Sequence, residues 1–356
     1  MQTQPIHLKG DLLLIDNSTL SEICACPRRA MYKFLSKRQL KKNRAALFFG
    51  GAMHKALEVR DKMDKILVDE SVRIAMYEAL IEYYEDADFE GDYRNLDYAC
   101  KTVDKYNEAY RFDQHPPVKI DGEPAVELPF ALHVADMEVN ATLLVVDPDE
   151  NDGKPFEKYI GTLRIMFTGK IDRVVRYHGE LYVFDHKTSS MGGPNFFSEF
   201  YTAMQFRGYK WALEQIMGES VSGVIVNGII CRPPVKSDGR VNYDMDRHVI
   251  PISDEHRDEW MNSYLLGVRE WLDCIINQIN FPDAPEQAFP IRTGSCFAKY
   301  GTCEFYDVCC LPTSQRASML STGLFEDHSW SPLDDNAKPK EKPEPMEFGG
   351  LFDHLG

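Results

Sequence analysis

Residues 164–188, RIMFTGKIDRVVRYHGELYVFDHKT, contain two apolar segments separated by a short polar turn and predict a β-hairpin. The first strand is expected over 164–177 and the second over 180–188. Between them, His178 and Gly179 suit a two-residue turn, because glycine adopts positive φ without strain and histidine tolerates it. The rest of the chain is organised around this hairpin.

The length of the turn determines which side chains of the hairpin face one another. With two turn residues, Tyr177 lies opposite Glu180, and counting back along both strands places Asp172 opposite Asp185. Side chains alternate along a strand, so Lys187 shares the face of Asp185. The Cβ atoms of the two acids then lie about 4.5–5.5 Å apart, which is destabilising unless a cation lies between them. The hairpin thus predicts a hard-metal site with an adjacent ammonium group, and the alternative is a solvated hairpin with ordinary surface charges.

The composition is ordinary for a soluble globular protein, with 44% hydrophobic residues, 27% charged residues and a net charge of −16. No run of about 18 apolar residues is present, so no membrane span is expected. The N-terminal segment lacks the basic and apolar regions of a signal peptide. We therefore expect a cytoplasmic protein whose nine cysteines are thiols or metal ligands rather than disulfides.

Charge is distributed unevenly along the chain. Residues 28–44 contain eight basic side chains interleaved with aromatic ones, which suits a phosphate backbone, although a charge run is more often a solvated face. Residues 311–356 are rich in Pro, Ser, Lys and Glu and predict a flexible, disordered tail. Two related peptides within it, GLFEDH at 323–328 and GLFDH at 350–354, are candidates for docking on a partner protein. The alternative for the first copy is that it folds back on its own domain.

Hydrophobic periodicity predicts helices before and after a set of strands, and therefore an α/β domain. The expected helices cover 19–35, 52–67, 68–88, 97–113, 197–217 and 254–279. Besides the hairpin, the expected strands cover 125–134, 136–146, 221–230 and 246–252. One domain is expected over 1–310, with an N-terminal helical part at 18–113, a sheet core at 125–252 and a C-terminal helix and cysteine segment at 254–310.

Three motifs occur in a fixed order: GGAMHKALE at 50–58, the GKIDRVV…LYVFDHKTSS hairpin, and QFRGYKWAL at 205–213. Together they resemble the PD-(D/E)XK nuclease superfamily. More narrowly, they look like its RecB-type branch, which includes CRISPR-associated RecB-like exonucleases and many phage relatives. The resemblance covers about residues 18–310. It implies a restriction-endonuclease-like core, with a central mixed β-sheet flanked by helices.

The resemblance also implies an activity and a set of metal ligands. The activity is metal-dependent hydrolysis of DNA, most simply by an exonuclease acting on single strands or DNA ends in recombination, repair or replication. Mg²⁺ or Mn²⁺ is the expected ion, because hard cations prefer oxygen ligands. The family pattern assigns the ion to His54, Asp172, Asp185 and the backbone carbonyl of His186, and in some branches to an earlier acid that matches Glu127.

The remaining site residues follow from the same resemblance. Lys187 is the motif lysine, which would position or activate water or stabilise the charge that develops on the phosphate. Gln205 and Tyr209 are four residues apart and share one helix face. In the family, such a pair contacts DNA or holds the active-site lysine. The alternative for Tyr209 is an aromatic side chain that packs in the core.

The cysteines form a second pattern, in which C-x6-C-x5-C near the C-terminus is matched by a cysteine about 270 residues earlier. This resembles the iron–sulfur subgroup of the same nucleases and implies a [4Fe–4S] cluster held by four thiolates. Zinc and unligated thiols are the alternatives, although zinc pairs are more often spaced C-x2–4-C. The implied cluster ligands are Cys26, Cys296, Cys303 and Cys309, with Cys24 and Cys310 as adjacent alternates.

Two other functions remain open from the sequence. The first is a non-catalytic DNA-binding or replication accessory protein that retains the nuclease fold. The intact set of Asp172, Asp185 and Lys187 argues against it, because a retired site usually loses one such residue. The second is an interaction scaffold that works through the C-terminal tail.

Overall fold

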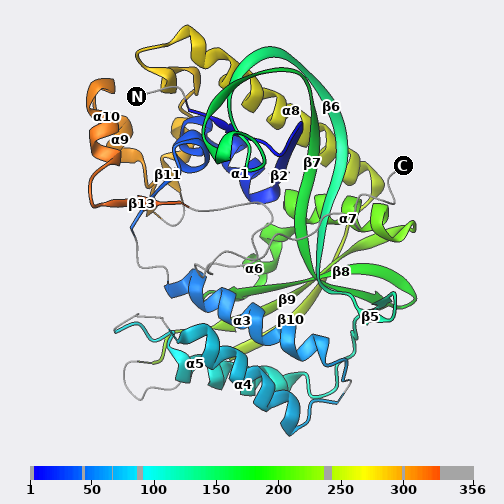
Figure 1. Cartoon of the computed structure of the whole chain (residues 1–356). Coiled ribbons are helices and arrows are strands. Elements are labelled where there is room, and N and C mark those ends of the chain that lie inside the picture. Colours follow the sequence, from blue (N-terminus) through cyan, green and yellow to red (C-terminus); the bar gives the residue numbers. More distant parts are fainter. Residues whose placement is uncertain are drawn as a thin grey trace.

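The computed structural model describes residues 4–41, 45–65, 67–85, 91–235, 243–298 and 301–328. At its centre lies a seven-stranded sheet in the order β1–β6–β7–β8–β9–β10, with β2 paired to β7. Helices cover both faces of this sheet (Figure 1), which confirms the predicted α/β class. The strand bounds are Ile6–His7 (β1), Leu12–Asp16 (β2), Val126–Val146 (β6), Phe156–Tyr177 (β7), Glu180–Ser189 (β8), Val221–Cys231 (β9) and Tyr243–Pro251 (β10).

Both parallel and antiparallel pairs occur in the sheet. β7 is antiparallel to β6 and β8, and β9 is antiparallel to β10, whereas β8 and β9 run parallel. β1 and β2 are parallel to their neighbours β6 and β7. A parallel pair needs a crossover connection, and the β8–β9 crossover contains helix α7 (Met204–Met217). The sheet is therefore mixed, as the family resemblance implies.

The hairpin at the centre of the sheet has the predicted two-residue turn. Tyr177 pairs with Glu180, and His178 and Gly179 have φ values of 51° and 86°. Positive φ at both central residues is the geometry of a type I′ turn, whose twist matches that of the flanking strands. The predicted register between β7 and β8 is confirmed.

β6 and β7 are longer than the sequence predicts. The segments 125–134 and 136–146 form a single strand, and β7 begins at Phe156 instead of near residue 164. Two register shifts interrupt the β6–β7 ladder, the first of them near residue 135. Such irregularities bend a strand pair, and β6 and β7 arch together in Figure 1. The break in the apolar pattern near residue 135 thus marks a bulge rather than the end of a strand.

The main helices form two layers. α3, α4 and α5 pack together on one face of the sheet, and α1, α7 and α8 pack on the other (Figure 1). The bounds of the helices are Asn17–Ala25 (α1), Pro27–Ala30 (α2), Ala45–Lys62 (α3), Glu70–Tyr84 (α4), Leu96–Ala109 (α5), Pro194–Ser198 (α6), Asp254–Asn277 (α8), Tyr306–Cys310 (α9) and Thr313–Leu320 (α10), with a π-helix at Met31–Leu35.

Two helical segments are interrupted, the first at Pro27, a residue type that breaks helices, and the second where the sequence predicts continuity. The segment 19–35 divides at Cys26, which has an extended backbone, because Pro27 lacks the N–H group that a continuous helix needs. The segment 197–217 divides at Ala203, which is also extended and precedes α7. Both breaks let short helical pieces change direction at the edge of the sheet.

Short paired strands complete the described chain. They are β4 and β5 (Lys119–Ile120 and Glu123–Pro124) and β11 and β12 (Phe297–Ala298 and Gly301–Thr302). Within the described ranges, none of the helices combines the length and the hydropathy needed to cross a membrane.

The C-terminal part of the described chain is folded. β13 (Phe325–Asp327) pairs antiparallel with β3 (Arg38–Leu40). Phe325 is buried, and its ring stacks on that of Phe305 with centroids 5.8 Å apart. The structure thus differs from the expected flexible tail: the peptide at 323–328 folds back on the domain, which is the alternative to partner docking. Residues 329–356, including the second peptide at 350–354, lie outside the described residues.

Candidate active site

Three carboxylates occupy neighbouring positions on three adjacent strands. Glu127 is on β6, Asp172 on β7 and Asp185 on β8. The pairs on either side of Glu127 place it opposite Asp172, and the last β7–β8 pair places Asp172 next to Asp185. These flanking pairs are Val126–Arg173, Leu128–Ile171 and Arg173–Phe184. We call the three carboxylates the acidic row.

The acidic row lies where β7 and β8 separate. Beyond the Arg173–Phe184 pair, the backbone ladder between these strands ends. Asp172 Oδ2 then accepts a hydrogen bond of 2.8 Å from the backbone N of His186. A carboxylate thus satisfies a β8 donor that no longer has a backbone partner on β7. This bond fixes the orientation of Asp172 at the point of separation.

His54 of α3 completes a compact group with two members of the acidic row. Ligand atoms of His54, Glu127 and Asp172 all lie within 4.8 Å of one another. His54 Nδ1 is 3.4 Å from Asp172 Oδ2. Carboxylate oxygens with one imidazole nitrogen suit Mg²⁺ or Mn²⁺. Asp185 falls outside this group of three, and its carboxylate contacts Lys187 instead.

The backbone of Glu127 is unusual for a strand. Its φ of 51° lies in the left-handed region, which interrupts the extended conformation of β6. A non-glycine residue held in this way costs on the order of 1–3 kcal/mol, and such residues cluster at functional sites. The structure therefore supports Glu127 more strongly than the family pattern alone does.

The pKa values of the acidic row indicate that its charge is incompletely neutralised. Burial and the Asp172 charge raise the pKa of Glu127 to about 7, although Lys170 acts in the opposite direction. Burial also raises the pKa of Asp185, to about 6, with the Asp172 charge adding to the shift and Lys187 opposing it. Burial disfavours charge on Asp172 too, but His54, His186 and Lys187 lower its pKa. A bound divalent cation would offset the excess negative charge, so the donor set and its electrostatics fit the implied metal.

Lys187 lies beside the acidic row, and its side-chain amine stays protonated. Its Nζ is 2.6 Å from Asp185 Oδ2 and 5.6 Å from the centroid of the Phe206 ring. Burial disfavours the charged amine, yet Asp185 and Asp172 raise the pKa of Lys187 above its ordinary value. The side chain therefore offers a positive charge at neutral pH, which suits charge stabilisation better than proton abstraction.

Gln205 and Tyr209 of α7 lie close to Asp185 of the acidic row. Gln205 Nε2 donates a 3.1 Å hydrogen bond to Tyr209 Oη. The Tyr209 ring is buried and lies edge-on to Phe130 at 5.9 Å. Burial and the charge of Asp185 raise the pKa of Tyr209. Tyr209 therefore packs in the core and also lies near Asp185. Packing and support of the site are thus compatible roles for this residue.

Two glycines allow α3 to carry His54 to the sheet. Gly50 and Gly51 lie inside α3, which begins before the expected start at residue 52. A Cβ atom on Gly50 would lie 3.2 Å from Thr188 Oγ1, and one on Gly51 would collide with the Tyr83 hydroxyl. The glycines thus permit close packing between α3, β8 and α4. His54 follows one turn later, over Asp172.

The sequence-based reasoning missed several residues around the site. Lys170 forms an ion pair with Glu127, and strand alternation from Asp172 was the signal for it. Arg173 and the His186 side chain point to the opposite face, where both contact Asp61 of α3. The strand period predicts that opposite orientation, but no local pattern identifies Asp61 as their partner.

Three of the four implied cluster cysteines come together from the two ends of the chain. Burial raises the pKa of the Cys309 thiol to about 11, with further contributions from Cys303 and Cys26. Burial likewise raises the pKa of Cys303, to which Cys26 contributes. The fourth residue, Cys296, accepts a 2.8 Å backbone hydrogen bond from Cys303. Of the alternates, Cys24 lies near Arg292 and Glu270, and Cys310 lies near Tyr306, to which Cys296 is also close.

The spacing of the cysteines bears on the zinc alternative. Zinc–sulfur bonds of about 2.3 Å would bring the sulfur atoms of a tetrahedral site within about 4 Å of one another. In the part of the chain that the structure describes, no three thiols lie within 4.8 Å of one another. Among the described residues, the thiols therefore do not form a preassembled three-cysteine zinc site.

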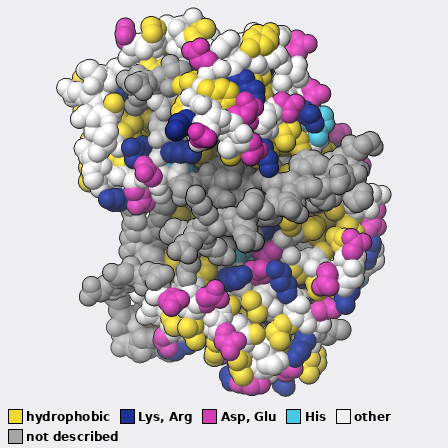
Figure 2. Space-filling view, viewed as in Figure 1, with side chains coloured by type: hydrophobic (Ala, Val, Ile, Leu, Met, Phe, Trp, Pro, Cys, Tyr) yellow, Lys and Arg dark blue, Asp and Glu magenta, His cyan; other side chains and the backbone are white. Residues whose placement is uncertain are grey.

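The basic stretch at 28–44 is engaged within the domain over much of its length. Arg28 is buried and its Nε donates a 2.9 Å hydrogen bond to the Phe289 carbonyl. Glu22 forms ion pairs with Arg29 and Lys33, and Arg38 pairs with Asp327. Lys42 and Arg44 lie outside the described residues. Because these four cations are engaged by partners within the domain, they do not form a free phosphate-binding strip. Figure 2 shows acidic and basic side chains intermingled on the described surface of this face.

Comparison with known proteins places this site in a family. The model of the PD-(D/E)XK nuclease superfamily matches residues 17–310, and the chain belongs to this superfamily. Its class is therefore that of the nucleases that use divalent metals at a site of this kind. The match includes the hairpin, α3 and α7, which carry the candidate residues.

Other comparisons add little. Among 14 matching chains of solved structures is the crystal structure of SSO0001. It shares 13% sequence identity, covers 75% of this chain and 84% of that chain, and has a TM-score of 0.24. A likeness of this degree contributes nothing to the functional assignment. No curated protein sequence matches the chain.

Proposed function

We propose that this protein is an Mg²⁺- or Mn²⁺-dependent deoxyribonuclease, and specifically an exonuclease that acts on single-stranded DNA or DNA ends. Its role would lie in recombination, repair or replication. One observation carries the proposal: Glu127, Asp172 and Asp185 form a largely buried acidic row with His54 and Lys187 beside it. The exonuclease assignment itself rests on the resemblance to the RecB-type branch.

The residues of the site divide into those that hold the ion and those that act on the substrate. His54, Glu127, Asp172, Asp185 and the carbonyl of His186 would hold the ion. A bound Mg²⁺ or Mn²⁺ supplies Lewis-acid polarisation of the phosphate and acidifies water. Lys187 places a positive charge where negative charge develops on the phosphate. Gln205 and Tyr209 support Asp185 and Lys187 from α7.

The test is cleavage of end-labelled single-stranded and duplex DNA by anaerobically purified protein, with and without Mg²⁺ or Mn²⁺. Asp172→Ala and Lys187→Ala should abolish cleavage. Lys101→Ala is a matched control, because Lys101 is an exposed lysine that pairs with Asp97 one turn away on α5. Equal DNA degradation by the wild type and by both site variants would show that the activity is a contaminant and refute the proposal.

The same assay separates the alternative functions. A non-catalytic DNA-binding or replication accessory protein would retain DNA binding without metal-dependent cleavage. A scaffold that works through its tail would lose its function when residues 329–356 are removed, whereas a nuclease would still cut DNA. The truncation begins at 329 because residues up to 328 pack on the domain. The identity of a tail partner would follow from a comparison of proteins retained by the full chain and by the truncated chain.

We also propose that Cys26, Cys296, Cys303 and Cys309 hold a [4Fe–4S] cluster. The proximity of Cys26 to Cys303 and Cys309 supports it. The cluster would fasten the N-terminal helices to the C-terminal segment. Anaerobic protein should be brown, absorb near about 400 nm and contain about four iron atoms per chain. Stoichiometric zinc without iron would refute the cluster.

The finer classification remains part of the same proposal. The order of the three motifs supports the RecB-type branch and a phage-type relative, which would act in the cytoplasm of its host. We propose one nuclease domain over 1–310 to which residues 311–328 are docked. Limited proteolysis followed by mass spectrometry would locate the boundary between this unit and the remaining tail.

A further inference from the structure

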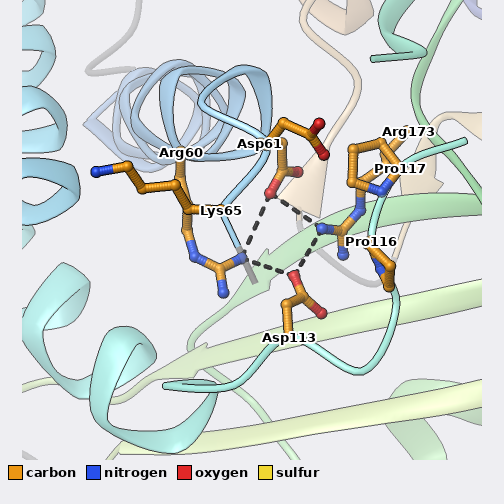
Figure 3. A pocket seen from close by; sticks show the side chains of 8 residues that line it. Arg60, Asp61, Lys65, Asp113, Pro116, Pro117 and Arg173 are labelled. Carbon is orange, nitrogen blue, oxygen red and sulfur yellow. Dashed lines mark hydrogen bonds and ion pairs between the residues drawn. The ribbon is translucent and has the colours of Figure 1, made fainter. Parts of the chain in front are cut away.

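The face of the sheet opposite the acidic row carries a second buried cluster of charges. Figure 3 shows Arg60, Asp61, Asp113 and Arg173 converging beside a cavity of about 10 Å³. Arg173 Nη1 lies 3.0 Å from Asp61 Oδ1 and 2.8 Å from Asp113 Oδ2. Arg60 Nη1 lies 3.0 Å from Asp113 Oδ2. We call this group the ionic cluster.

Asp61 connects three elements that carry the candidate active site. It follows His54 by two turns of α3, so both residues lie along the same side of that helix. Its two strand partners are the residues that directly follow two members of the acidic row. Arg173 follows Asp172 on β7, and His186 follows Asp185 on β8, with His186 Nε2 3.5 Å from Asp61 Oδ2.

His186 transmits the position of Asp61 through the sheet. Its other ring nitrogen, Nδ1, lies 2.7 Å from Asn227 Nδ2 on β9, so the imidazole is held from both sides. The backbone N of the same residue donates to Asp172 Oδ2. The residue that contacts Asp61 through its ring therefore also orients Asp172 through its peptide group.

Asp61 is suited to this role because it is charged although buried. Burial disfavours the carboxylate, but Arg173, His186 and Arg60 lower the pKa of Asp61 below its ordinary value. Its side chain is 2% exposed. A buried carboxylate with several partners resists reorientation, because each partner would lose a charge-assisted hydrogen bond.

We propose that Asp61 is a positioning residue for the nuclease site, which through His186 and Arg173 fixes Asp172 relative to His54 and so sets the affinity of the metal site. This inference rests on the proposed metal-dependent function. Asp61 touches neither substrate nor metal in this scheme, and it acts through the two strands and α3.

The chain provides a matched control in Asp113. It is similarly buried and shares the partners Arg60 and Arg173, but it binds Arg247 instead of His186 and lies outside the helix of His54. Loss of either carboxylate therefore weakens the ionic cluster. Loss of Asp61 alone breaks the contact between α3 and His186 of β8, whereas Arg60 still joins α3 to Asp113.

The test measures Mn²⁺ affinity by isothermal titration calorimetry, together with kcat and KM on single-stranded DNA, for the wild type, Asp61→Asn and Asp113→Asn. Asp61→Asn should weaken Mn²⁺ binding about tenfold or more, as loss of supporting partners does at other metal sites. Its kcat should fall while KM for DNA stays within about twofold. Asp113→Asn should change the Mn²⁺ affinity less than about twofold, even where its Tm falls as far as that of Asp61→Asn.

A second variant keeps the inference testable if Asp61→Asn folds poorly. His186→Gln retains the backbone donor to Asp172 but removes the imidazole, and it should reproduce the weaker Mn²⁺ binding. The double variant should bind Mn²⁺ no more weakly than the worse single variant, because both act along one connection. Additive losses, an unchanged Asp61→Asn affinity, or an equal loss in Asp113→Asn would overturn the inference. Failure of the proposed function is distinct, since the wild type itself would then neither bind Mn²⁺ nor cut DNA.

Discussion

The two faces of β7 and β8 hold buried carboxylates in opposite electrostatic states. On one face, the pKa values of Glu127 and Asp185 are raised to about 7 and about 6. On the other, the pKa values of Asp61 and Asp113 are lowered. Burial disfavours charge on all four, so burial alone does not explain the difference. The difference in pKa follows from the number of cationic side chains that the protein places beside each pair of carboxylates.

The ionic cluster has enough positive charge of its own, whereas the acidic row does not. Arg60, Arg173 and Arg247 surround Asp61 and Asp113. In the acidic row, His54, His186 and Lys187 favour the charged form of Asp172, and the acids on either side of it hold protons more strongly. On the face of the ionic cluster, protein side chains thus neutralise the carboxylates without a ligand, and the cluster joins α3 to the sheet. The other face has room for an external cation, which is what a metal-dependent site requires.

The largest effect is expected from Asp172→Asn, which removes the central charge of the acidic row. Cleavage of DNA should fall by about 10²–10⁴-fold, the range seen when one catalytic group is removed. Single-turnover assays at saturating Mn²⁺ measure this loss, and circular dichroism checks that the fold is retained. Activity within about twofold of the wild type would show that the acidic row is not the catalytic centre.

The next largest effect concerns the ionic cluster and should appear in stability. Arg173→Met leaves Asp61 and Asp113 buried with fewer cations, which costs about 3–5 kcal/mol of the free energy of unfolding. Urea denaturation measures it. Arg176→Met on the same strand is the control, since Arg176 pairs with the exposed Glu219 and its removal should cost about 0–1 kcal/mol. Similar costs for the two variants would contradict the view that this face stabilises the fold.

Glu127→Gln should reveal the incomplete neutralisation of the acidic row. The folded-state pKa of Glu127 is about 7, above the ordinary value of 4.5. Its contribution to stability is therefore complete below pH 4.5 and is lost as the pH rises through about 7. Glutamine mimics the protonated form at every pH. In the absence of metal, the variant should match the wild type near pH 4.5 and exceed it near about pH 8 by on the order of 1–3 kcal/mol.

Thermal melts in EDTA at several pH values measure that difference. Added Mg²⁺ should narrow it, because the ion stabilises only the chain that binds it well. If the variant is less stable than the wild type near about pH 8 without metal, then the protein already neutralises the acidic row and the contrast between the two faces is lost.

The smallest effect is expected at the rim of the ionic cluster. Lys65 lines the cavity in Figure 3 but is partly exposed and pairs with the exposed Asp69. Lys65→Ala should change the free energy of unfolding by about 0–1 kcal/mol and leave DNA cleavage unchanged. A larger loss of stability would show that Lys65 also belongs to the ionic cluster.

Local patterns in the sequence were sufficient for the hairpin and for two of its acids. Alternation and a two-residue turn place Asp172 and Asp185 together, and Tyr177 does pair with Glu180. Helix boundaries were less predictable. The run 197–217 is apolar enough for one helix, yet its backbone is extended at Ala203, and periodicity alone does not register such a break.

The tertiary structure decided how distant segments complete the site. Glu127 joins Asp172 through a left-handed backbone on β6, and Asp61 reaches Arg173 across 112 positions of the chain. Likewise, Phe325 packs on Phe305 in a stretch whose composition indicates a flexible tail. These contacts depend on how β6, α3 and the C-terminal segment pack, which no local pattern specifies.

The sequence by itself therefore determined the hairpin, the facing pair of acids and the adjacent lysine. These features depend on the period of a strand and the length of a turn, which are local properties of the backbone. Only the tertiary structure decided on which face of the hairpin the carboxylates lack cationic partners and on which face they are neutralised. That balance is the sum of charges brought from distant segments into a medium of low dielectric constant, where each added cation shifts a carboxylate strongly.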